Sequence, residues 1–142
     1  MNKQAINIGE LISQTPINIK NKSKNYRPRL LKSLNNIWIY NVGDYTVRIK
    51  YPKIQKRLRA LLTEKQYNKL RQIKNRDVLI SCTCNYWKWN GPDFNAANNG
   101  YSERSFSDLS DPVVRDPEHK NLICKHVYAA LVKFKRDVKD AQ

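Results

Sequence analysis

The chain has 142 residues, with 27 Lys and Arg against 12 Asp and Glu, which gives a formal charge of +15 at pH 7. This length suits one domain that buries a modest core without disulfides. No stretch approaches the ~18 apolar residues of a membrane span, and the first residues lack the apolar core of a secretory signal. Such a charge favours an anionic partner, most often nucleic acid. The alternative explanation of the positive charge is an AT-rich coding sequence, which raises the Lys and Asn content.

The first 35 residues hold seven basic residues against Glu10 and show no sustained hydrophobic period. We therefore expect residues 1–35 to form a basic arm, followed by a single α+β domain over 36–142 with a long insert at 85–121. The arm is either a loose terminus or a segment that becomes ordered on a partner. Its basic residues near the domain are Lys20, Lys22, Lys24, Arg27, Arg29 and Lys32.

A β-hairpin is predicted where "IWIY" and "DYTVRIKY" flank Val42-Gly43. Strand alternation places Arg48 and Lys50 on one face. The other face carries Tyr45, Val47, Ile49 and Tyr51.

Helical spacing replaces this alternation over residues 53–75. The motif "TEKQ" at 63–66 matches a capping box, so we expect two helices that meet at Thr63. The predicted apolar stripe consists of Ile54, Leu58, Leu61, Leu62, Leu70 and Ile73. The same region is strongly basic, because residues 46–76 hold eleven Lys and Arg against Glu64.

The remaining elements are a third strand in "DVLISCTC", a long loop over residues 85–121, and a helix from about Leu122. Together they predict the α+β class, with a small antiparallel sheet of about three strands and packed helices. The C-terminal helix carries its apolar stripe at Ile123, Val127, Leu131, Phe134 and Val138. A loop as long as 85–121 is usually functional or held by something.

All three cysteines of the chain lie in a Cys-x-Cys at 82–84 and a Cys-x-His at 124–126. Residues i and i+2 of a strand point to the same face, so Cys82 and Cys84 can chelate one ion. On a helix, i and i+2 diverge by ~200°, so Cys124 must precede the C-terminal helix and His126 must lie in its first turn. Three thiolates and one imidazole are the ligands of a closed structural zinc site, which clamps the strand to the helix.

The alternative is that the three cysteines are ordinary buried residues. His119 is the competing histidine, but "DPEHKN" has the composition of a solvated loop. We therefore predict Zn²⁺ bound by Cys82, Cys84, Cys124 and His126, in a reducing intracellular compartment where clustered cysteines bind metal.

These motifs resemble the SWIM-type zinc finger, whose pattern is Cys-x-Cys, a variable gap and then Cys-x-His. The resemblance covers about residues 78–134 and implies a small strand-and-helix zinc fold that contacts DNA or protein. Here the gap is 39 residues, longer than usual. The insert, with "WKWNGPDFNAANNGY" and "DPVVRDPEHKNLICKH", is similar to long-gap versions in virion structural proteins of tailed bacteriophages.

Two surfaces are candidates for contact with partners. For phosphates the candidates are Lys53, Lys56, Arg57, Arg59, Lys133, Lys135 and Arg136, each of which has a solvated helix face as its alternative. For a protein partner the candidates are Trp87, Trp89, Phe94 and Tyr101, with Arg27 and Arg29 of the arm. The aromatic residues instead form a small core around the zinc if they point inward. Strand alternation places both tryptophans opposite the cysteines, so at least one can face outward.

Two functions therefore compete. The first is a non-enzymatic zinc module in a larger assembly with protein partners, such as the capsid, portal or neck of a phage particle in the host cytoplasm. The second is a DNA-binding module in regulation, recombination or transposition. Catalysis has no support, because the thiols are committed to metal and no acid pair, Gly-rich phosphate loop or small-molecule site is evident.

Overall fold

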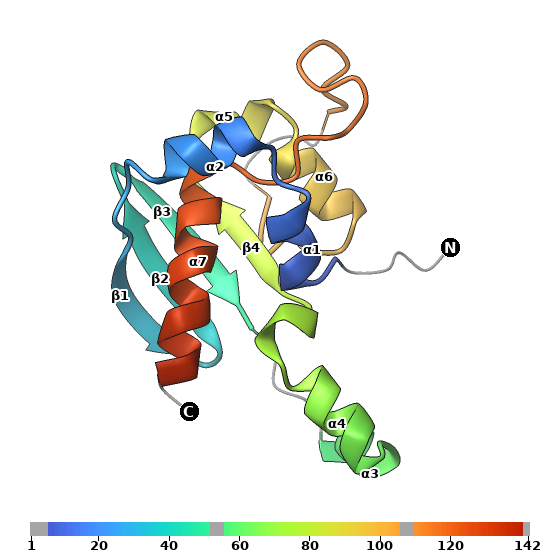
Figure 1. Ribbon diagram of the computed structural model, residues 1–142. Coiled ribbons are helices and arrows are strands. Elements are labelled where there is room, and N and C mark those ends of the chain that lie inside the picture. Colours follow the sequence, from blue (N-terminus) through green and yellow to red (C-terminus); the bar gives the residue numbers. More distant parts are fainter. Residues whose placement is uncertain (1–5, 52–55, 106–109, 141–142) are drawn as a thin grey trace.

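The computed structural model describes residues 6–51, 56–105 and 110–140. Its centre is one antiparallel sheet of four strands in the order β1-β2-β3-β4 (Figure 1). The α+β class is thus confirmed, with one strand more than expected. The strands are β1 (Arg29–Leu34), β2 (Ile37–Val42), β3 (Tyr45–Lys50) and β4 (Leu79–Cys82).

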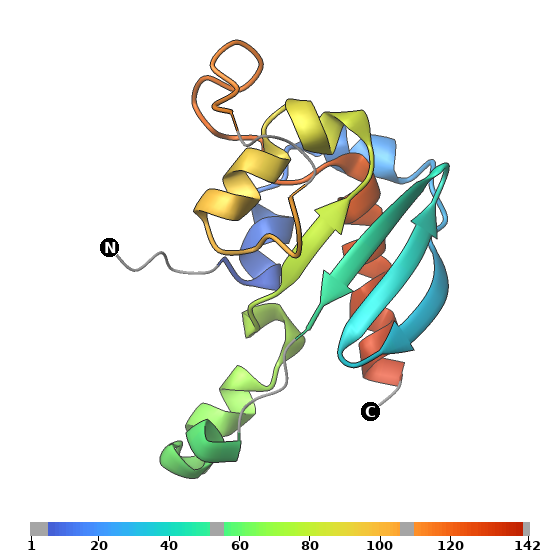
Figure 2. The ribbon, with the colours of Figure 1, turned by 180° about the vertical axis from the view of Figure 1, so that it is seen from behind.

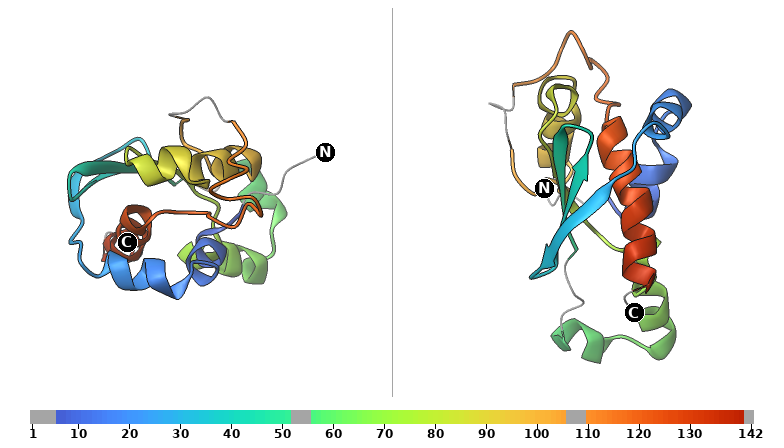
Figure 3. Two further views of the ribbon diagram at one scale, coloured as in Figure 1. Left: turned by 90° about the horizontal axis from the view of Figure 1, so that it is seen from above. Right: turned by 90° about the vertical axis from the view of Figure 1, so that its left-hand side faces the viewer.

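Helix α7 (Lys125–Asp140) packs across β2, β3 and β4 on one face of the sheet. Helices α1 (Ile8–Ser13) and α2 (Ile17–Ser23) pack against α7 on the same side (Figure 3). The predicted apolar stripe is confirmed, since all its members are buried. Ile123 lies just before α7, and the others lie on it at the helical spacing. These members are Ile123, Val127, Leu131, Phe134 and Val138.

The N-terminal segment differs from the expected basic arm. Residues 8–34 form α1, α2 and the edge strand β1, and Ile8 and Leu11 are fully buried in the core. The helices are only six and seven residues long, so they show too few turns for a hydrophobic period. Strand β1 escapes recognition because it is an edge strand with both faces largely exposed, which removes the usual alternation.

Two tight turns set the register of the sheet. Asn35 and Asn36 both have positive φ between β1 and β2, as a type I′ turn requires. Between β2 and β3, Gly43 has φ +63° and lies so close to the Tyr26 ring that a Cβ would be 3.1 Å from it. The predicted β2–β3 hairpin is confirmed, with Val47 and Ile49 buried on the α7 side.

Helices α3 (Lys56–Leu61) and α4 (Glu64–Leu70) extend away from the rest of the molecule (Figure 2). The predicted capping box at Thr63 is confirmed: its hydroxyl accepts from Gln66 N, and the Gln66 side chain accepts from Thr63 N. The predicted apolar stripe is not buried on these two helices, because no side chain of either helix is buried. Ile73, beyond α4, is partly buried against the core. Ile54 lies outside the described residues. We call residues 56–70 the α3–α4 projection.

The region after β4 contains two helices rather than one long loop. They are α5 (Asn85–Trp89) and α6 (Pro92–Asn98), on the side of the sheet away from α2 (Figure 3). Residues beyond α6 then return to the free edge of β4, where Ile80 N donates to Tyr101 O and Glu103 N donates to Ile80 O. The insert over 85–121 is therefore joined to the fold at both ends and is also hydrogen-bonded to the edge of the sheet between them.

Among the described residues, no helix has the length and apolar character needed to cross a lipid bilayer.

Candidate metal centre

The structure brings the four predicted ligands together. Cys82 ends β4, Cys84 precedes α5, Cys124 precedes α7, and His126 lies in the first turn of α7, as expected. All four side chains are buried, and their candidate ligand atoms lie within 4.8 Å of one another. The cluster thus joins the sheet, the start of the insert and the C-terminal helix.

The two cysteines next to the helices also act as helix caps. Trp87 N donates to Cys84 Sγ at 3.3 Å, and Val127 N donates to Cys124 Sγ at 3.4 Å. A backbone N–H and the positive end of a helix both favour a negative charge on sulfur. The backbone is therefore arranged to stabilise thiolates at these two positions.

Hydrogen bonds between the thiols shift the pKa values of the three cysteines in opposite directions. Hydrogen bonds from Cys124 and Cys82 hold the pKa of Cys84 far below its ordinary value, against the effect of burial. Burial, together with the hydrogen bonds that Cys124 donates, raises the pKa of Cys124 well above the ordinary value. For Cys82, the hydrogen bond from Cys124 favours the thiolate, but the bond to Cys84 and burial outweigh it and raise the pKa to about 12. The pKa of Cys84 is thus lowered, whereas those of Cys82 and Cys124 are raised.

Two tyrosine rings enclose the imidazole of His126. Tyr26 meets it edge-on with ring centroids 4.8 Å apart, and Tyr45 lies at the same centroid distance at a tilt of 52°. His126 Nδ1 is buried, and no residue that the structure describes gives it a hydrogen bond. A buried ring nitrogen without such a partner, beside three buried thiols, fits coordination to a metal ion.

The donor set fits zinc. Ligands at ~2.0–2.3 Å from a tetrahedral zinc lie roughly 3.3–3.8 Å from one another, so small side-chain adjustments would close the observed cluster around an ion. Sulfur and imidazole are the donors that zinc prefers, and four of them complete its coordination. When bound, the ion supplies a structural cross-link between β4, the insert and α7.

Comparison with protein families agrees with this geometry. The SWIM zinc finger family model matches residues 66–93 and 117–135. All four cluster residues fall within these two segments. Residues 94–116 of the insert, which lie between the segments, are not matched. Two segments of the chain thus resemble the SWIM zinc finger, and the buried Cys₃His cluster that they contribute implies Zn²⁺. No curated protein and no solved structure matches the chain.

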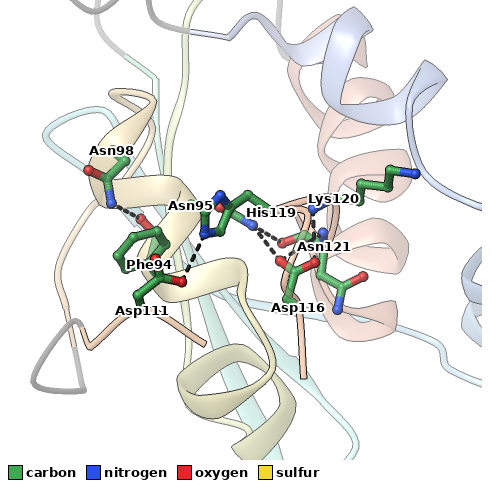
Figure 4. A network of polar contacts seen from close by, with 8 residues as sticks. All are labelled: Phe94, Asn95, Asn98, Asp111, Asp116, His119, Lys120 and Asn121. Carbon is green, nitrogen blue, oxygen red and sulfur yellow. Dashed lines mark hydrogen bonds and ion pairs between the residues drawn. The ribbon is translucent and has the colours of Figure 1, made fainter. Parts of the chain in front are cut away.

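The competing histidine takes no part in the cluster. His119 Nε2 lies 2.8 Å from Asp111 Oδ1 on the exposed loop before α7 (Figure 4). Its ring is also 5.3 Å from the Phe94 ring. His119 therefore belongs to the surface of the insert.

A buried carboxylate that sequence reasoning missed holds the insert together. Asp116 is 4% exposed, and its oxygens accept from Asn95 Nδ2, Lys120 N and Asn121 N (Figure 4). Asn95 Nδ2 also donates to Asn121 O, and Asn121 Nδ2 donates to Asn90 O. Both ends of the insert are thus joined by this network as well as by the cluster.

The four aromatic candidates for partner contact separate into two groups. Trp87 and Tyr101 are fully buried, and Tyr101 Oη donates to Leu122 O, so these two belong to the core. Trp89 is half exposed and Phe94 is partly buried. Alternation does not apply to the tryptophans, because the chain becomes helical at Asn85. Trp89 is the outward-facing one.

The basic candidates lie in three places. Lys56, Arg57 and Arg59 are exposed on α3, where the Arg59 guanidinium stacks 3.6 Å from the centroid of Tyr67 on α4. Lys53 lies outside the described residues. Arg27 and Arg29 are exposed at the start of β1. On α7, Arg136 is exposed, whereas Lys133 and Lys135 are partly buried.

Proposed function

We propose that this chain is a non-enzymatic, zinc-stabilised module that contacts DNA through its α3–α4 projection. The observation that carries the proposal is the charge of this element. From Lys56 to Leu70 the projection holds five Lys and Arg, with Glu64 as its one acidic residue. An element that extends from the body, buries no side chain and carries this charge suits contact with a polyanion.

The cluster supports a structural rather than a catalytic role for the metal. Four protein ligands leave no open position at which an activated water would bind. The site is also enclosed by buried side chains and by the rings around His126. In this proposal the zinc fixes the domain, and the projection supplies the contact.

The test is a salt titration of binding to labelled duplex DNA of varied sequence. The slope of log K against log salt is about 0.9 per phosphate contact. A Lys56→Gln, Arg57→Gln, Arg59→Gln variant should therefore lose roughly two to three units of slope. A matched control removes three exposed charges elsewhere, with Lys32→Gln, Lys50→Gln and Lys120→Gln. Equal losses in both variants would count against the projection as the contact.

Dependence on DNA sequence separates two roles. Binding without sequence preference favours a packing or clamping role, because phosphate contacts carry no sequence information. A strong preference favours regulation, recombination or transposition.

A second candidate role is that of an assembly component with a protein partner, such as a structural protein of a tailed-phage particle. It is favoured by Leu58 and Leu61, which are 45% and 78% exposed on α3. Large apolar side chains that are exposed on an extended element suit a protein interface. Mass spectrometry of particles purified from the source should then find the chain at a constant copy number, and its absence from particles would oppose this role.

A further inference from the structure

Three adjoining hollows follow the exposed side of α7, and Arg136 lines all of them. One, of about 500 Å³, lies between the end of α7 and residues 71–74, at the base of the projection. A second, of about 460 Å³, lies between α2 and α7. A third, of about 350 Å³, lies beside the start of β1. In Figure 1, α2 lies beside the start of α7. We call these hollows together the α7 groove.

The lining of the α7 groove is strongly cationic. Besides Arg136, each hollow contains further basic side chains: Arg71, Lys74 and Lys135 in the first, Lys20 and Lys24 in the second, and Arg27 and Lys133 in the third.

The acidic residue that lines these hollows is already engaged. Asp137 accepts from Tyr40 Oη at 2.7 Å and from Lys133 Nζ at 2.9 Å. Its charge is thus matched by a lysine, and the groove keeps a large excess of positive charge. An extended polyanion has the complementary charge.

The hollow between α2 and α7 is also apolar. Ile17 is 71% exposed and Val132 is 39% exposed at its wall, and the partly buried rings of Tyr26 and Tyr128 complete it. Phosphate needs no such surface, whereas the flat face of an unpaired base buries itself against apolar and aromatic side chains. In duplex DNA the base faces are stacked within the helix and cannot enter a hollow.

We propose that the α7 groove binds a single-stranded nucleic acid, with its phosphates along the cationic lining and a base in the hollow between α2 and α7. This site is separate from the α3–α4 projection. In the proposed function the α3–α4 projection contacts duplex DNA; here, in addition, the α7 groove binds a single strand.

The first test uses a labelled oligothymidine of about 12 nucleotides and a duplex of equal charge. Arg136→Gln should weaken oligothymidine binding by about tenfold and lower the salt slope by about 0.7. Lys120→Gln is the matched control, because it removes one exposed charge from the insert. Zinc content and melting temperature, which should match wild type, exclude misfolding. Unchanged oligothymidine binding by Arg136→Gln would overturn the proposal.

The second test separates base contact from charge. Val132→Ser changes no charge and should weaken binding of oligothymidine about threefold to tenfold, because the base loses part of the apolar surface that it buries. It should leave binding of an abasic oligonucleotide unchanged. Equal binding of the abasic and normal strands by the wild-type protein would exclude a base in the hollow. Equal competition by polyglutamate would assign the groove to acidic proteins and also overturn the proposal.

The two proposals fail separately. If the triple α3 variant keeps full duplex binding while Arg136→Gln loses oligothymidine binding, the proposed role of the projection fails and the groove stands. The reverse pattern rejects the groove alone.

Discussion

Two regions flank β4 along the chain, and they are held in different ways. The insert after β4 is anchored by the Cys₃His cluster, by the bonds of Asp116 and by the pairing of Tyr101 and Glu103 with Ile80. The α3–α4 projection before β4 has no buried side chain, and its internal contacts are local, such as the capping box at Thr63. The insert is thus held by three independent anchors, whereas the described residues of the α3–α4 projection show no anchor of comparable strength.

This difference indicates that the two regions have different roles. A segment that is cross-linked and packed contributes to the stability of the domain. A segment that leaves its charges and leucines exposed contributes little stability but offers a surface to a partner. Substitutions in the insert should therefore change unfolding, and substitutions in the projection should change binding.

The largest effect is expected at the metal ligands. Cys124→Ser should abolish tight zinc binding and destabilise the domain by several kcal/mol, because structural zinc contributes its binding free energy to folding. Elemental analysis should find about one zinc per wild-type chain and a strongly reduced content in the variant. A Cys124→Ser protein that remains fully folded without metal would contradict the structural role.

A matched pair of histidines sharpens this prediction. His126→Ala should lose zinc affinity, whereas His119→Ala should keep it, since His119 contacts Asp111 on the exposed loop. The opposite order would move the fourth ligand to His119.

The next effect concerns the polar anchor of the insert. Gly91 has φ +118°, and a Cβ there would collide with Asp116 Oδ2. Gly91→Ala should therefore destabilise the protein by about 2–3 kcal/mol, through backbone strain and displacement of a buried carboxylate. Thermal unfolding of the zinc-loaded protein measures this. An unchanged melting temperature would mean that the Asp116 network contributes little to holding the insert.

A smaller effect is expected at the third anchor. Glu103 accepts from Ser81 Oγ, Arg48 Nε and Arg104 Nε, and its side chain is 7% exposed. Burial opposes ionisation of this carboxyl, but the hydrogen bonds and the two arginines together lower its pKa. The bonds therefore stabilise the fold above the ordinary Glu pKa of about 4.3, and this stability is lost as the pH falls through the lowered value.

Glu103→Gln should accordingly cost about 1 kcal/mol at neutral pH. The difference from wild type should shrink below about pH 4. Urea unfolding of the zinc-loaded proteins at several pH values is the measurement, with spectroscopic detection of zinc release at each pH. A cost that stays constant into acid would assign the effect to packing rather than to charge.

The parts that the sequence predicts are those in which chain spacing alone determines geometry. Cys82 and Cys84 at the end of a strand, and Cys124 and His126 at a helix start, can meet at one ion with few alternatives. The capping box at Thr63 and the hairpin around Gly43 are equally local. The turn at Asn35 and Asn36 also carried a usable signal, since two adjacent Asn residues tolerate positive φ.

The parts that escaped prediction depend on contacts distant in sequence. Asp116 lies in a segment with the composition of turns, and only the fold brings Asn95 to it. Tyr26 reaches His126 because α2 packs on α7, which no local pattern indicates. In the opposite sense, the apolar spacing of α3 suggested burial, but no element of the described structure covers Leu58 or Leu61.

The smallest effect on stability is therefore expected at Leu61. Leu61→Ser removes an apolar side chain that is 78% exposed, so the free energy of unfolding should change by less than about 0.5 kcal/mol. Leu131→Ser, at a fully buried position of α7, is the contrasting variant and should cost at least ~3 kcal/mol. If the melting temperature of wild type instead rises with protein concentration and Leu61→Ser removes this dependence, the leucine is buried between copies of this chain. The projection would then serve self-association, and its charge would have to contact DNA from within an oligomer.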